Sequence, residues 1–331
     1  MAKRVMVVGG SGNISTAVTA LLIERDYEVS VFCRGQNFIK PHSEARIVKG
    51  DRKDREGFIK TMRGGKYDYA IDMIGFTADD AQDDFAAFPD VERLVFTSSG
   101  AGYGELLSRE LPIKEDFVLG EVRWSYGIHK RAAENFLMEK FLSQGYPVTI
   151  IRPTVTYGRQ KAVVRQIGTD NVWIDRIRKG KPIVTGNPYL LRNFLYADDA
   201  AYAYAGALEH PVCAGQAYNM VGLKPYDWGI YHRTMMQVVG REVEMVEIPL
   251  NTLLAMQNDE FKVGEMITEN FQFNGFYSGE KIARDIPEFR ERTPLAEGLA
   301  KTVAFLDKHG FIPNSDEHPY EDEMIRRQKG V

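Results

Sequence analysis

Residues 4–15 read RVMVVGGSGNIS, and this stretch decides the fold that we expect. An apolar strand pattern leads directly into a glycine loop, and a helical pattern follows. Glycines allow a tight turn and the close approach of a pyrophosphate, which the free N–H groups of a helix N-terminus bind. Ser15 stands where a third glycine usually lets the helix pack against the strand. The residues expected to contact a dinucleotide here are Gly9, Gly12, Asn13 and Ile14.

The first half of the chain continues this unit by alternating short apolar runs with helical patterns, which is typical of parallel βαβ units. The runs are mostly continuous, as expected for strands whose two faces are both covered by helices. The predicted strands are Arg4–Val8, Glu28–Cys33, Arg46–Lys49, Tyr69–Met73, Arg93–Thr97 and Val148–Ile151. The predicted helices are Ile14–Arg25, Arg55–Met62, Asp79–Ala87 and Tyr126–Gln144. Right-handed crossovers between such strands give a Rossmann-type doubly wound parallel sheet.

After Gly158 the pattern becomes less regular, and we expect a smaller, mixed α/β C-terminal substrate lobe. Its clearest segments are helical over Asn171–Lys179 and Ala197–Leu208 and extended over Ile183–Thr185. The predicted division is a dinucleotide-binding domain over residues 1–158, with segments near 190–220 returning to it, and a mainly substrate-binding lobe over 159–331.

The charge balance argues against a protein built mainly to bind nucleic acid. The 331 residues include 42 basic and 46 acidic side chains, for a formal net charge of -4. Nucleic-acid binding usually requires a basic excess. A site for one anionic small molecule needs only one or two local cations and is compatible with this balance.

Neither a targeting segment nor a membrane span is expected. The start, MAKRVMVVGG, has too short an apolar run for a signal peptide, and no stretch approaches the roughly 18 apolar residues of a membrane span. Cys33 and Cys213 are typical of reduced thiols in a cytoplasmic protein. His210 lies near Cys213, but no second such pair completes a zinc site, so we expect no structural metal.

The end of the second predicted strand bears on the choice of cofactor. An acid there commonly binds the ribose hydroxyls of NAD, whereas an arginine accommodates the 2′-phosphate of NADP. This chain has Arg34 there and no acid before Glu44, which favours NADP over NAD. Alternatively, Arg34 is solvated or stacks on the adenine. Asp51, after the third strand, is a candidate acceptor for the adenine amino group, with a turn or helix-cap role as its alternative.

A tyrosine and a lysine four residues apart form the candidate catalytic pair. Tyr126 and Lys130 would lie on one helix face, where the ammonium and a positively charged nicotinamide ring would lower the pKa of the phenol. Tyr126 would then exchange a proton with a substrate hydroxyl during hydride transfer, and Lys130 would hydrogen-bond the nicotinamide ribose. Two other pairs share the spacing, namely Tyr157/Lys161 and Tyr277/Lys281. Only Tyr126 opens a strong helix after a strand that ends in hydroxyl residues.

Those hydroxyl residues are Thr97, Ser98 and Ser99, at the sheet edge where α/β proteins bind ligands. Ser99, or alternatively Ser98, would donate a hydrogen bond to the substrate oxygen and orient it. A polar turn before Gly100 is the structural alternative.

Together these residues resemble the extended short-chain dehydrogenase/reductase family, also called the NAD-dependent epimerase/dehydratase family, over nearly the whole chain. The segment 97–104 is similar to the family's Ser-Ser…Tyr-Gly segment, with Ser99 at the catalytic Ser/Thr position. Tyr126 and Lys130 match the family pair. Residues 152–158 resemble the segment beside the nicotinamide, although many members that act on sugar nucleotides have Asn at the position of Arg152.

Residues 192–199 resemble the family's Arg-Asp-Phe…Asp-Asp stretch, which implies that Arg192 binds a substrate diphosphate. Alternatively, Arg192 pairs with Asp198 or Asp199. The predicted catalytic residues are Ser99, Tyr126 and Lys130, and the predicted substrate-binding residues are Ser99, Tyr126 and Arg192. The predicted cofactor-binding residues are Gly9, Gly12, Asn13, Ile14, Arg34, Asp51, Arg52, Met73, Ile74, Gly75, Thr97, Lys130, Pro153 and Val155.

The resemblance implies an NAD(P)-dependent enzyme that acts on a small molecule, expected to be a nucleoside-diphosphate sugar, and it is compatible with a homodimer. An epimerase of a sugar nucleotide or related polyol is the first hypothesis, and an NADPH-dependent ketoreductase is the alternative. Dehydratases and decarboxylases are disfavoured because Gly100 and Ala101 replace the acids that follow the catalytic hydroxyl in those members.

The first strands are similar to those of a bacterial and chloroplast subgroup that includes the chloroplast stem-loop RNA-binding proteins. A non-catalytic Rossmann-fold RNA-binding protein is therefore the alternative of another class. The joint presence of Ser99, Tyr126 and Lys130 and the lack of a basic excess argue against it.

Overall fold

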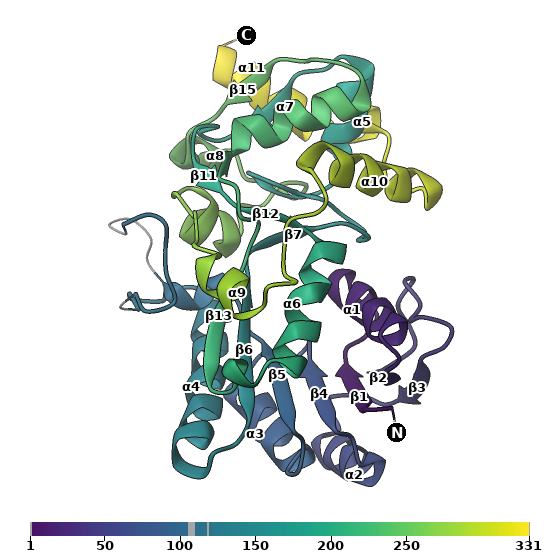
Figure 1. Cartoon of the computed structure of the whole chain (residues 1–331). Helices are drawn as coiled ribbons and strands as arrows, with labels where there is room; N and C mark the ends of the chain where they lie inside the picture. The colour runs from purple at the N-terminus through teal and green to yellow at the C-terminus, as the bar shows by residue number, and fades with distance from the viewer. Residues whose placement is uncertain (1, 105–109, 118, 331) are drawn as a thin grey trace.

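A seven-stranded parallel sheet forms the centre of the computed structural model, which describes residues 2–104, 110–117 and 119–330. Its strand order is β13-β6-β5-β4-β1-β2-β3 (Figure 1). The order reverses between β1 and β4, and such a reversal creates a ligand crevice at the carboxyl ends of the strands. The strands are β1 (Arg4–Val8), β2 (Glu28–Cys33), β3 (Arg46–Lys49), β4 (Tyr69–Asp72), β5 (Arg93–Thr97), β6 (Val148–Pro153) and β13 (Gln216–Met220).

Helices cover both faces of the sheet, and the side chains of β1 alternate between the two resulting layers. Val5 and Val7 pack with α1 and α6, whereas Met6 and Val8 pack with α2, α3 and α4. This burial on both faces explains why the strands are continuous apolar runs. The helices of this half are α1 (Asn13–Glu24), α2 (Arg55–Gly65), α3 (Ala78–Ala87), α4 (Ser125–Gln144) and α6 (Ala197–Glu209), with the short helix η1 (Gly100–Tyr103) ahead of α4.

The predicted fold class is confirmed, and the differences at element ends have local causes. β4 ends at Asp72, one residue before the predicted end, because the Asp72 carboxylate accepts hydrogen bonds from the backbone N–H groups of Ile74 and Gly75 and so caps a turn. β6 extends two residues beyond its predicted end because it pairs with β13 as far as Pro153.

Two later segments return to the first half of the chain. α6 packs along α1, and β13 forms the edge of the sheet beside β6 (Figure 1). Helix α9 (Glu280–Asp285) packs against β13 in turn. These contacts are consistent with a domain boundary near residue 158 and with segments around 190–220 that pack on the first domain. We retain this division as a proposal.

The rest of the chain forms a mixed α/β lobe with an aromatic core around Trp173, Trp228 and Tyr231. Its helices are α5 (Val172–Lys179), α7 (Trp228–Val239), α8 (Leu250–Ala255), α10 (Leu295–Lys308) and α11 (Tyr320–Lys329). The remaining short helices are η2 (Pro211–Cys213), the π-helical η3 (Ile267–Phe271) and η4 (Ser315–Glu317). The short strands form the pairs β7 (Val155–Tyr157) with β12 (Phe194–Tyr196), β8 (Val164–Arg165) with β9 (Gly168–Thr169), β10 (Ile183–Thr185) with β15 (Met245–Glu247), and β11 (Leu191–Arg192) with β14 (Tyr226–Asp227).

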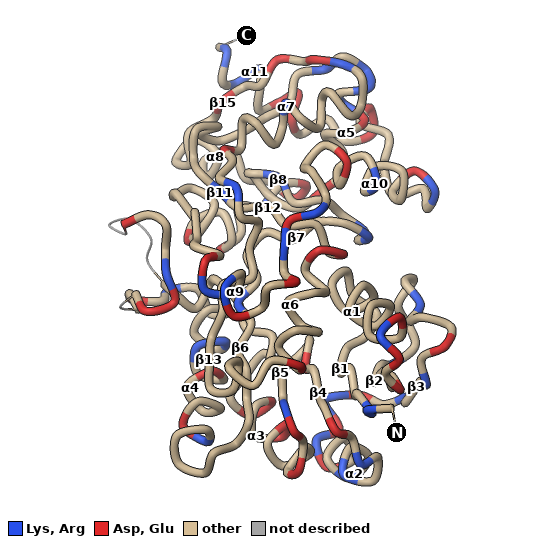
Figure 2. The backbone as a smooth tube through the Cα atoms, in the orientation of Figure 1, with Lys and Arg blue, Asp and Glu red and all other residues tan. Residues whose placement is uncertain are grey.

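Lys and Arg are interspersed with Asp and Glu over both halves of the molecule (Figure 2). Cys33 and Cys213 are both buried and unpaired. In the described part of the chain, no helix has the length and apolar character that crossing a membrane requires.

Candidate active site

The glycine loop after β1 adopts a conformation that requires glycine. Gly9 has a φ of +87°, and a Cβ there would lie 2.5 Å from the Ile74 side chain. The Ser15 hydroxyl donates a hydrogen bond to the Gly9 carbonyl at 2.9 Å and accepts one from the Gly12 N–H at 2.8 Å. A side chain that stabilises the loop therefore occupies the position of the third glycine. The next N–H groups begin α1, whose first turn has no acceptors within the helix.

A cavity of about 960 Å³ opens beside this loop and passes the ends of β2, β3 and β4. Its volume lies at the upper end of the range for ligand pockets. The predicted cofactor-binding residues that line it are Gly9, Gly12, Arg34, Asp51, Arg52 and Ile74.

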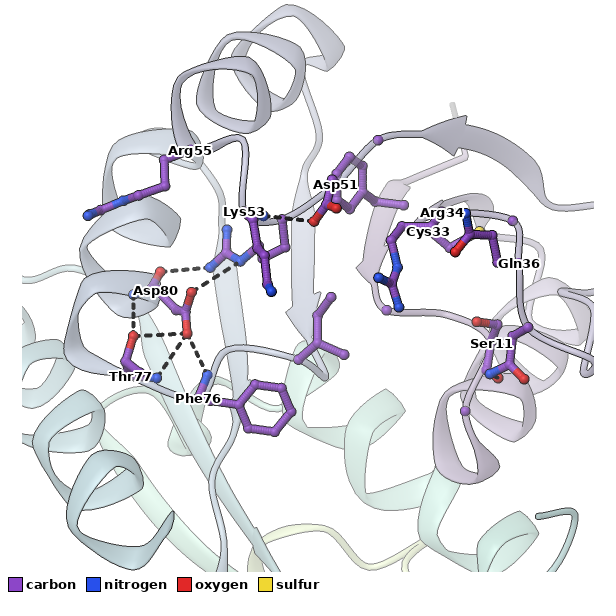
Figure 3. Close-up of a pocket in the computed structure, with 18 of the residues that line it drawn as sticks. Ser11, Cys33, Arg34, Gln36, Asp51, Lys53, Arg55, Phe76, Thr77 and Asp80 are labelled. Atoms are coloured by element: carbon purple, nitrogen blue, oxygen red, sulfur yellow. Dashed lines mark hydrogen bonds and ion pairs between the residues drawn. The ribbon is translucent and has the colours of Figure 1, made fainter. Parts of the chain in front are cut away.

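Arg34 lines the large cavity just after the end of β2. Its exposed side chain points into the space between Asp51 and Ser11 (Figure 3). Within the described residues it has no ion-pair partner. Lys53 lines the same cavity, and the sequence did not single it out because nothing in its local pattern marks it. Arg34 and Lys53 give the cavity two cations that can bind a negatively charged ligand group.

Asp51 and Arg52, both predicted to contact the cofactor, already have protein partners. Asp51 accepts a hydrogen bond from the Lys53 N–H at 2.9 Å, which is the turn role given above as its alternative. Arg52 is buried and donates to Asp72 at 3.1 Å and to Asp84 at 2.7 Å. Their cofactor contacts stay predictions, while the Arg52 guanidinium belongs to a buried ion-pair cluster.

The segment after Arg34 connects the two halves of the molecule at one end of the cavity. Asn37 donates a hydrogen bond to the Ser11 carbonyl at 2.7 Å. Phe38 packs edge-on against Phe311, with ring centroids 4.9 Å apart, and the Lys161 ammonium lies 5.1 Å from the Phe38 ring. Asn37, Phe38 and Lys161 all line the cavity, so residues distant in sequence partly enclose its contents.

Of the three Tyr–Lys pairs, Tyr126/Lys130 is the one with both members on a single helix, α4. Tyr157 belongs to strand β7, and Tyr277 precedes α9. The Tyr126 ring contacts Phe76, which lines the large cavity, at a centroid distance of 6.3 Å. The Tyr126 ring also contacts the Trp124 ring, with their centroids 5.2 Å apart.

Lys130 is buried, and backbone carbonyls fix its ammonium. Nζ donates hydrogen bonds to the Gly75 and Thr97 carbonyls at 2.7 Å each. An ammonium has three donors, so one N–H remains for a ligand. Burial lowers the pKa of Lys130 to about 8, and the charge of Asp72 is the largest effect that opposes this lowering.

The pKa of the Tyr126 phenol is raised, whereas the sequence analysis expected it to be lowered. Burial raises its pKa, and a hydrogen bond with Ser99 works against that rise. The Lys130 ammonium lies 5.7 Å from the Tyr126 ring centre and is bonded to carbonyls instead of the phenol. Lowering the pKa of this phenol therefore requires a further positive charge beside it.

A second, narrower cavity of about 230 Å³ begins at Ser99 and is bordered by Trp124. Ser99 Oγ accepts a hydrogen bond from the Ala101 N–H at 3.1 Å, so Ser99 also caps η1. Ser98, the alternative donor, is 1% exposed, and its hydroxyl has no hydrogen-bond partner among the described residues. The predicted residues that line this narrow cavity are Ser99, Pro153, Val155 and Arg192.

Arg192 is a buried cation on the wall of the narrow cavity. Its guanidinium donates to the Asn270 side chain at 2.5 Å and to the Phe273 carbonyl at 2.9 Å, and its Nε has no partner among the described residues. Burial lowers the pKa of Arg192 to about 10. Such a shift is typical of a guanidinium that lacks a compensating carboxylate.

The alternative role of Arg192, an ion pair with Asp198 or Asp199, is wrong. Asp198 pairs with Arg159. Asp199 accepts hydrogen bonds from the N–H and the hydroxyl of Thr293 at 2.8 and 3.2 Å. Both acids therefore connect neighbouring segments and leave the guanidinium without a counter-charge.

Arg152, which departs from the family pattern, has a structural partner. Its buried guanidinium pairs with Glu134 of α4 at 2.6 Å and donates to the Tyr103 hydroxyl at 2.8 Å. These contacts join β6 to α4. The remaining predicted site residues border neither cavity directly, and they are Asn13, Ile14, Met73, Gly75, Thr97, Tyr126 and Lys130.

A bound dinucleotide fits the groups that this site leaves without partners. Both polar atoms of the Asn13 side chain are buried and unpaired within the described chain. The first-turn N–H groups of α1, the Arg34 guanidinium and the third donor of Lys130 are free to bind phosphate and ribose oxygens. A ligand along this edge of the sheet would thus bind Asn13, Ile14 and Arg34 at one end and Lys130 at the other.

Comparisons with known proteins identify the family of the chain. The model of the NAD dependent epimerase/dehydratase family matches residues 5–220. The 2′-dehydrokanamycin reductase of Streptomyces kanamyceticus is 24% identical over 95% of this chain and 87% of its own length. The chloroplast stem-loop binding protein of 41 kDa b of Arabidopsis thaliana is 24% identical over 98% of this chain and 85% of its own. The structure of UDP-glucose 4-epimerase with UDP-glucose from Thermotoga maritima superimposes with a TM-score of 0.71 at 20% identity, covering 92% of this chain and 99% of the other.

Proposed function

We propose that this chain, which belongs to the NAD-dependent epimerase/dehydratase family, epimerises a sugar nucleotide or related polyol at Ser99, Tyr126 and Lys130. As a member of that family, it is an NAD(P)-dependent enzyme of the extended short-chain dehydrogenase/reductase type. The proposed reaction removes a hydride from a carbinol and returns it to the other face of the resulting ketone. Substrate and product are then isomers, and the cofactor is regenerated in every cycle.

The observation that carries this proposal is the position of Tyr126 between two cavities. Its ring contacts Phe76, which lines the large cavity, and Trp124, which lines the narrow one. Ser99 lines the narrow cavity and hydrogen-bonds the Tyr126 side chain. A phenol at this boundary is suited to exchange a proton with a substrate in the narrow cavity beside a cofactor in the large one.

The bound nicotinamide supplies the acceptor and then the donor of the hydride. Tyr126 takes the proton of the substrate hydroxyl and later returns it. Ser99 donates a hydrogen bond to the substrate oxygen and so fixes it within reach of the phenol. Lys130 would hold the cofactor ribose with its third N–H, and the positive charge of the oxidised nicotinamide would be the further charge that favours the phenolate.

Arg192 supports a substrate that carries a diphosphate. A buried guanidinium without a carboxylate partner is unfavourable unless another anion pairs with it. Because Arg192 lines the narrow cavity, an anion bound to it would lie beside the proposed site of the reacting sugar. We therefore propose a nucleoside-diphosphate sugar as the substrate, in keeping with the relative that was solved with UDP-glucose.

Different observations favour the epimerase and the reductase. The Asn37–Ser11 hydrogen bond and the Phe38–Phe311 contact partly enclose the large cavity, which favours a cofactor that stays bound through many turnovers. Arg34 favours NADP over NAD, and an NADP preference suits an NADPH-dependent ketoreductase, which must release its cofactor after each turnover. We place the epimerase first because the enclosing contacts oppose release.

The deciding experiment supplies UDP-glucose and other sugar nucleotides without added cofactor and follows the products by NMR, while absorbance reports reduced nicotinamide. Formation of an isomer with no net change in that absorbance supports the epimerase. A strict stoichiometric need for NADPH would replace the epimerase with the ketoreductase.

RNA binding is the competing function of another class, and one relative is named as a stem-loop binding protein. The interspersed charges of the surface provide little of the phosphate attraction on which RNA affinity depends (Figure 2). Tight RNA binding that weakens steeply with salt, together with no effect of nicotinamide cofactors, would favour this alternative.

A homodimer stays a prediction, to be checked by the mass of the protein in solution.

A further inference from the structure

Four buried charged side chains lie together beside the catalytic helix: Arg52, Asp72, Asp84 and Lys130. Asp72 and Asp84 are fully buried, and Arg52 and Lys130 are 8% and 1% exposed. Buried charges are costly unless they are paired and hydrogen-bonded. The proposed reaction uses only Lys130, so the other three require another explanation.

Asp72 ends β4 and caps the turn that follows it. Its Oδ1 accepts hydrogen bonds from the N–H groups of Ile74 at 2.6 Å and Gly75 at 2.8 Å, and its Oδ2 accepts one from Arg52 at 3.1 Å. A Cβ at Gly75 would lie 2.8 Å from Asp72 Oδ2, so the turn wraps closely around the carboxylate. The carboxylate thereby fixes the orientation of the Ile74–Gly75 peptide group.

The next peptide group, between Gly75 and Phe76, supplies one of the two carbonyls that hold Lys130. The Gly75 carbonyl accepts from Lys130 Nζ at 2.7 Å, and the Thr97 carbonyl at the end of β5 accepts at the same distance. The same turn carries Ile74, whose side chain packs against Gly9 of the glycine loop. One short turn therefore links the carboxylate of Asp72 to both the catalytic ammonium and the cofactor loop.

We propose that Asp72 is a positioning residue which, through the Ile74–Gly75 turn, sets both the place and the charge of Lys130. This inference rests on the catalytic role proposed for Lys130. Arg52 is the buried counter-ion of this carboxylate, at 3.1 Å. Arg52, predicted from the sequence to contact the cofactor, would then affect the cofactor site through Asp72.

Each of the other acidic groups around Lys130 has a hydrogen-bond partner of its own. Glu134, on α4 itself, pairs with Arg152. The carboxylate of Asp80 on α3 caps that helix through the N–H groups of Phe76 and Thr77. Asp84, also on α3, accepts a hydrogen bond from Arg52 at 2.7 Å, and burial together with the charge of Asp72 raises its pKa well above the usual value. Asp72 is therefore the carboxylate with the most direct influence on Lys130.

The test compares three single variants of the full chain. Asp72→Asn removes the charge at the turn, and Asp84→Asn neutralises the other buried carboxyl that Arg52 contacts, which accepts no hydrogen bond from the N–H groups of Ile74 and Gly75. Asp83→Asn is the matched control. Asp83 lies beside Asp84 on α3 and is only 3% exposed, but its carboxylate pairs with Arg55 and not with the Ile74–Gly75 turn. Two readouts are needed: the titration of Lys130 by NMR of ¹³Cε-labelled lysine, assigned with Lys130→Arg, and the Kd for NADPH and NADH by fluorescence.

We expect the pKa of Lys130 to fall by about one pH unit or more in Asp72→Asn, as for the loss of one nearby opposite charge. The cofactor Kd should rise about tenfold, which corresponds to the loss of roughly one hydrogen bond to a charged group. Asp84→Asn and Asp83→Asn should behave like the wild type in both readouts.

An unchanged Lys130 titration in folded Asp72→Asn, or an equal change in Asp83→Asn, would overturn the inference. If Asp72→Asn does not fold, Asp72→Ser replaces it, since a serine hydroxyl can accept from the same turn N–H groups without a charge, and the same criteria apply. Failure of the wild type to bind either cofactor would instead refute the proposed function, while the lysine titration would still decide the role of Asp72.

Discussion

The Ser15 hydroxyl donates a hydrogen bond to the Gly9 carbonyl at 2.9 Å, from the first turn of α1 back across the glycine loop. The same oxygen accepts from the Gly12 N–H at 2.8 Å. Both ends of the loop are thus fixed to one side chain that is 2% exposed. A glycine at this position would leave room for close packing but would make neither contact, so in this chain the loop that faces the pyrophosphate depends on a hydroxyl.

Ser15→Ala should therefore weaken NAD(H) and NADP(H) binding by the same factor, because the pyrophosphate is common to both cofactors. Loss of the two hydrogen bonds should also lower the free energy of unfolding by about 1–2 kcal/mol. Fluorescence titration and denaturant unfolding measure the two effects. The control is Thr19→Ala, which removes another buried hydroxyl bond of α1, to the Ser15 carbonyl. It should lower stability without changing cofactor affinity, and an equal loss of affinity would contradict the role of Ser15.

The glycine loop, the strands and the Tyr–Lys helix were predictable because their signals are local in the sequence. The partners of buried charges were not. Arg52 pairs with Asp84, 32 positions away on α3, and Arg192 donates to Asn270, 78 positions away. The nearby Asp198 looked like a plausible partner from sequence alone, but the packing of β11 places Arg192 against the segment around η3 instead. Such contacts follow from tertiary packing, which local patterns do not encode.

The same reasoning explains which site residues were missed. Trp124 borders the narrow cavity and contacts Tyr126. Its position two residues before the tyrosine was a usable signal. Lys53 and Phe38 line the large cavity from loops, where no periodic pattern identifies a functional side chain.

Tyr126→Phe should reduce turnover by about 100-fold or more, the usual size of general acid–base effects. Because the hydroxyl does not contact the large cavity directly, the cofactor Kd should stay close to that of the wild type. The rate with a substrate identified by NMR, set beside a fluorescence titration, measures both. A variant with undiminished turnover would remove Tyr126 from the mechanism, whereas loss of cofactor binding would indicate a structural role.

Arg34→Ala should weaken NADP(H) binding and leave NAD(H) binding nearly unchanged, because the charge-assisted contact involves only the 2′-phosphate. Arg55→Ala is the matched control: Arg55 also lines the large cavity, but its guanidinium is bonded to Asp83. Calorimetry with both cofactors gives the ratio of affinities. Equal losses for NADP(H) and NAD(H) would show that Arg34 binds the adenosine and not the phosphate.

Lys130→Met should abolish turnover yet stabilise the fold near pH 7. The lowered pKa of about 8 against an ordinary 10.5 corresponds to a penalty of roughly 3 kcal/mol for the buried charge. Loss of the two hydrogen bonds of Lys130 costs about 2 kcal/mol, so the free energy of unfolding should rise by a net amount near 1 kcal/mol. The unfolded state binds more protons between about pH 8 and 10.5, so the wild type gains relative stability as the pH rises through that window. Denaturant unfolding at pH 7 and pH 10 should thus show the advantage of the variant shrinking, and an advantage that grows with pH would contradict the assignment.

Arg192 offers the most direct check of the substrate class. If its guanidinium binds a diphosphate, uridine or thymidine diphosphate should raise the Tm of the wild type and compete with the substrate, and Arg192→Met should lose both effects. The variant should remain folded, because relief of a buried cation whose pKa is about 10, worth roughly 3 kcal/mol, offsets the loss of its hydrogen bonds to Asn270 and Phe273. Arg159→Met is the control: it removes a guanidinium that pairs with Asp198 and does not line the narrow cavity, so it should leave the response to nucleotides intact. A response that survives in Arg192→Met would place the diphosphate elsewhere. If no nucleoside diphosphate stabilises the wild type, the substrate lacks a diphosphate, and a free sugar or cyclitol becomes the better assignment.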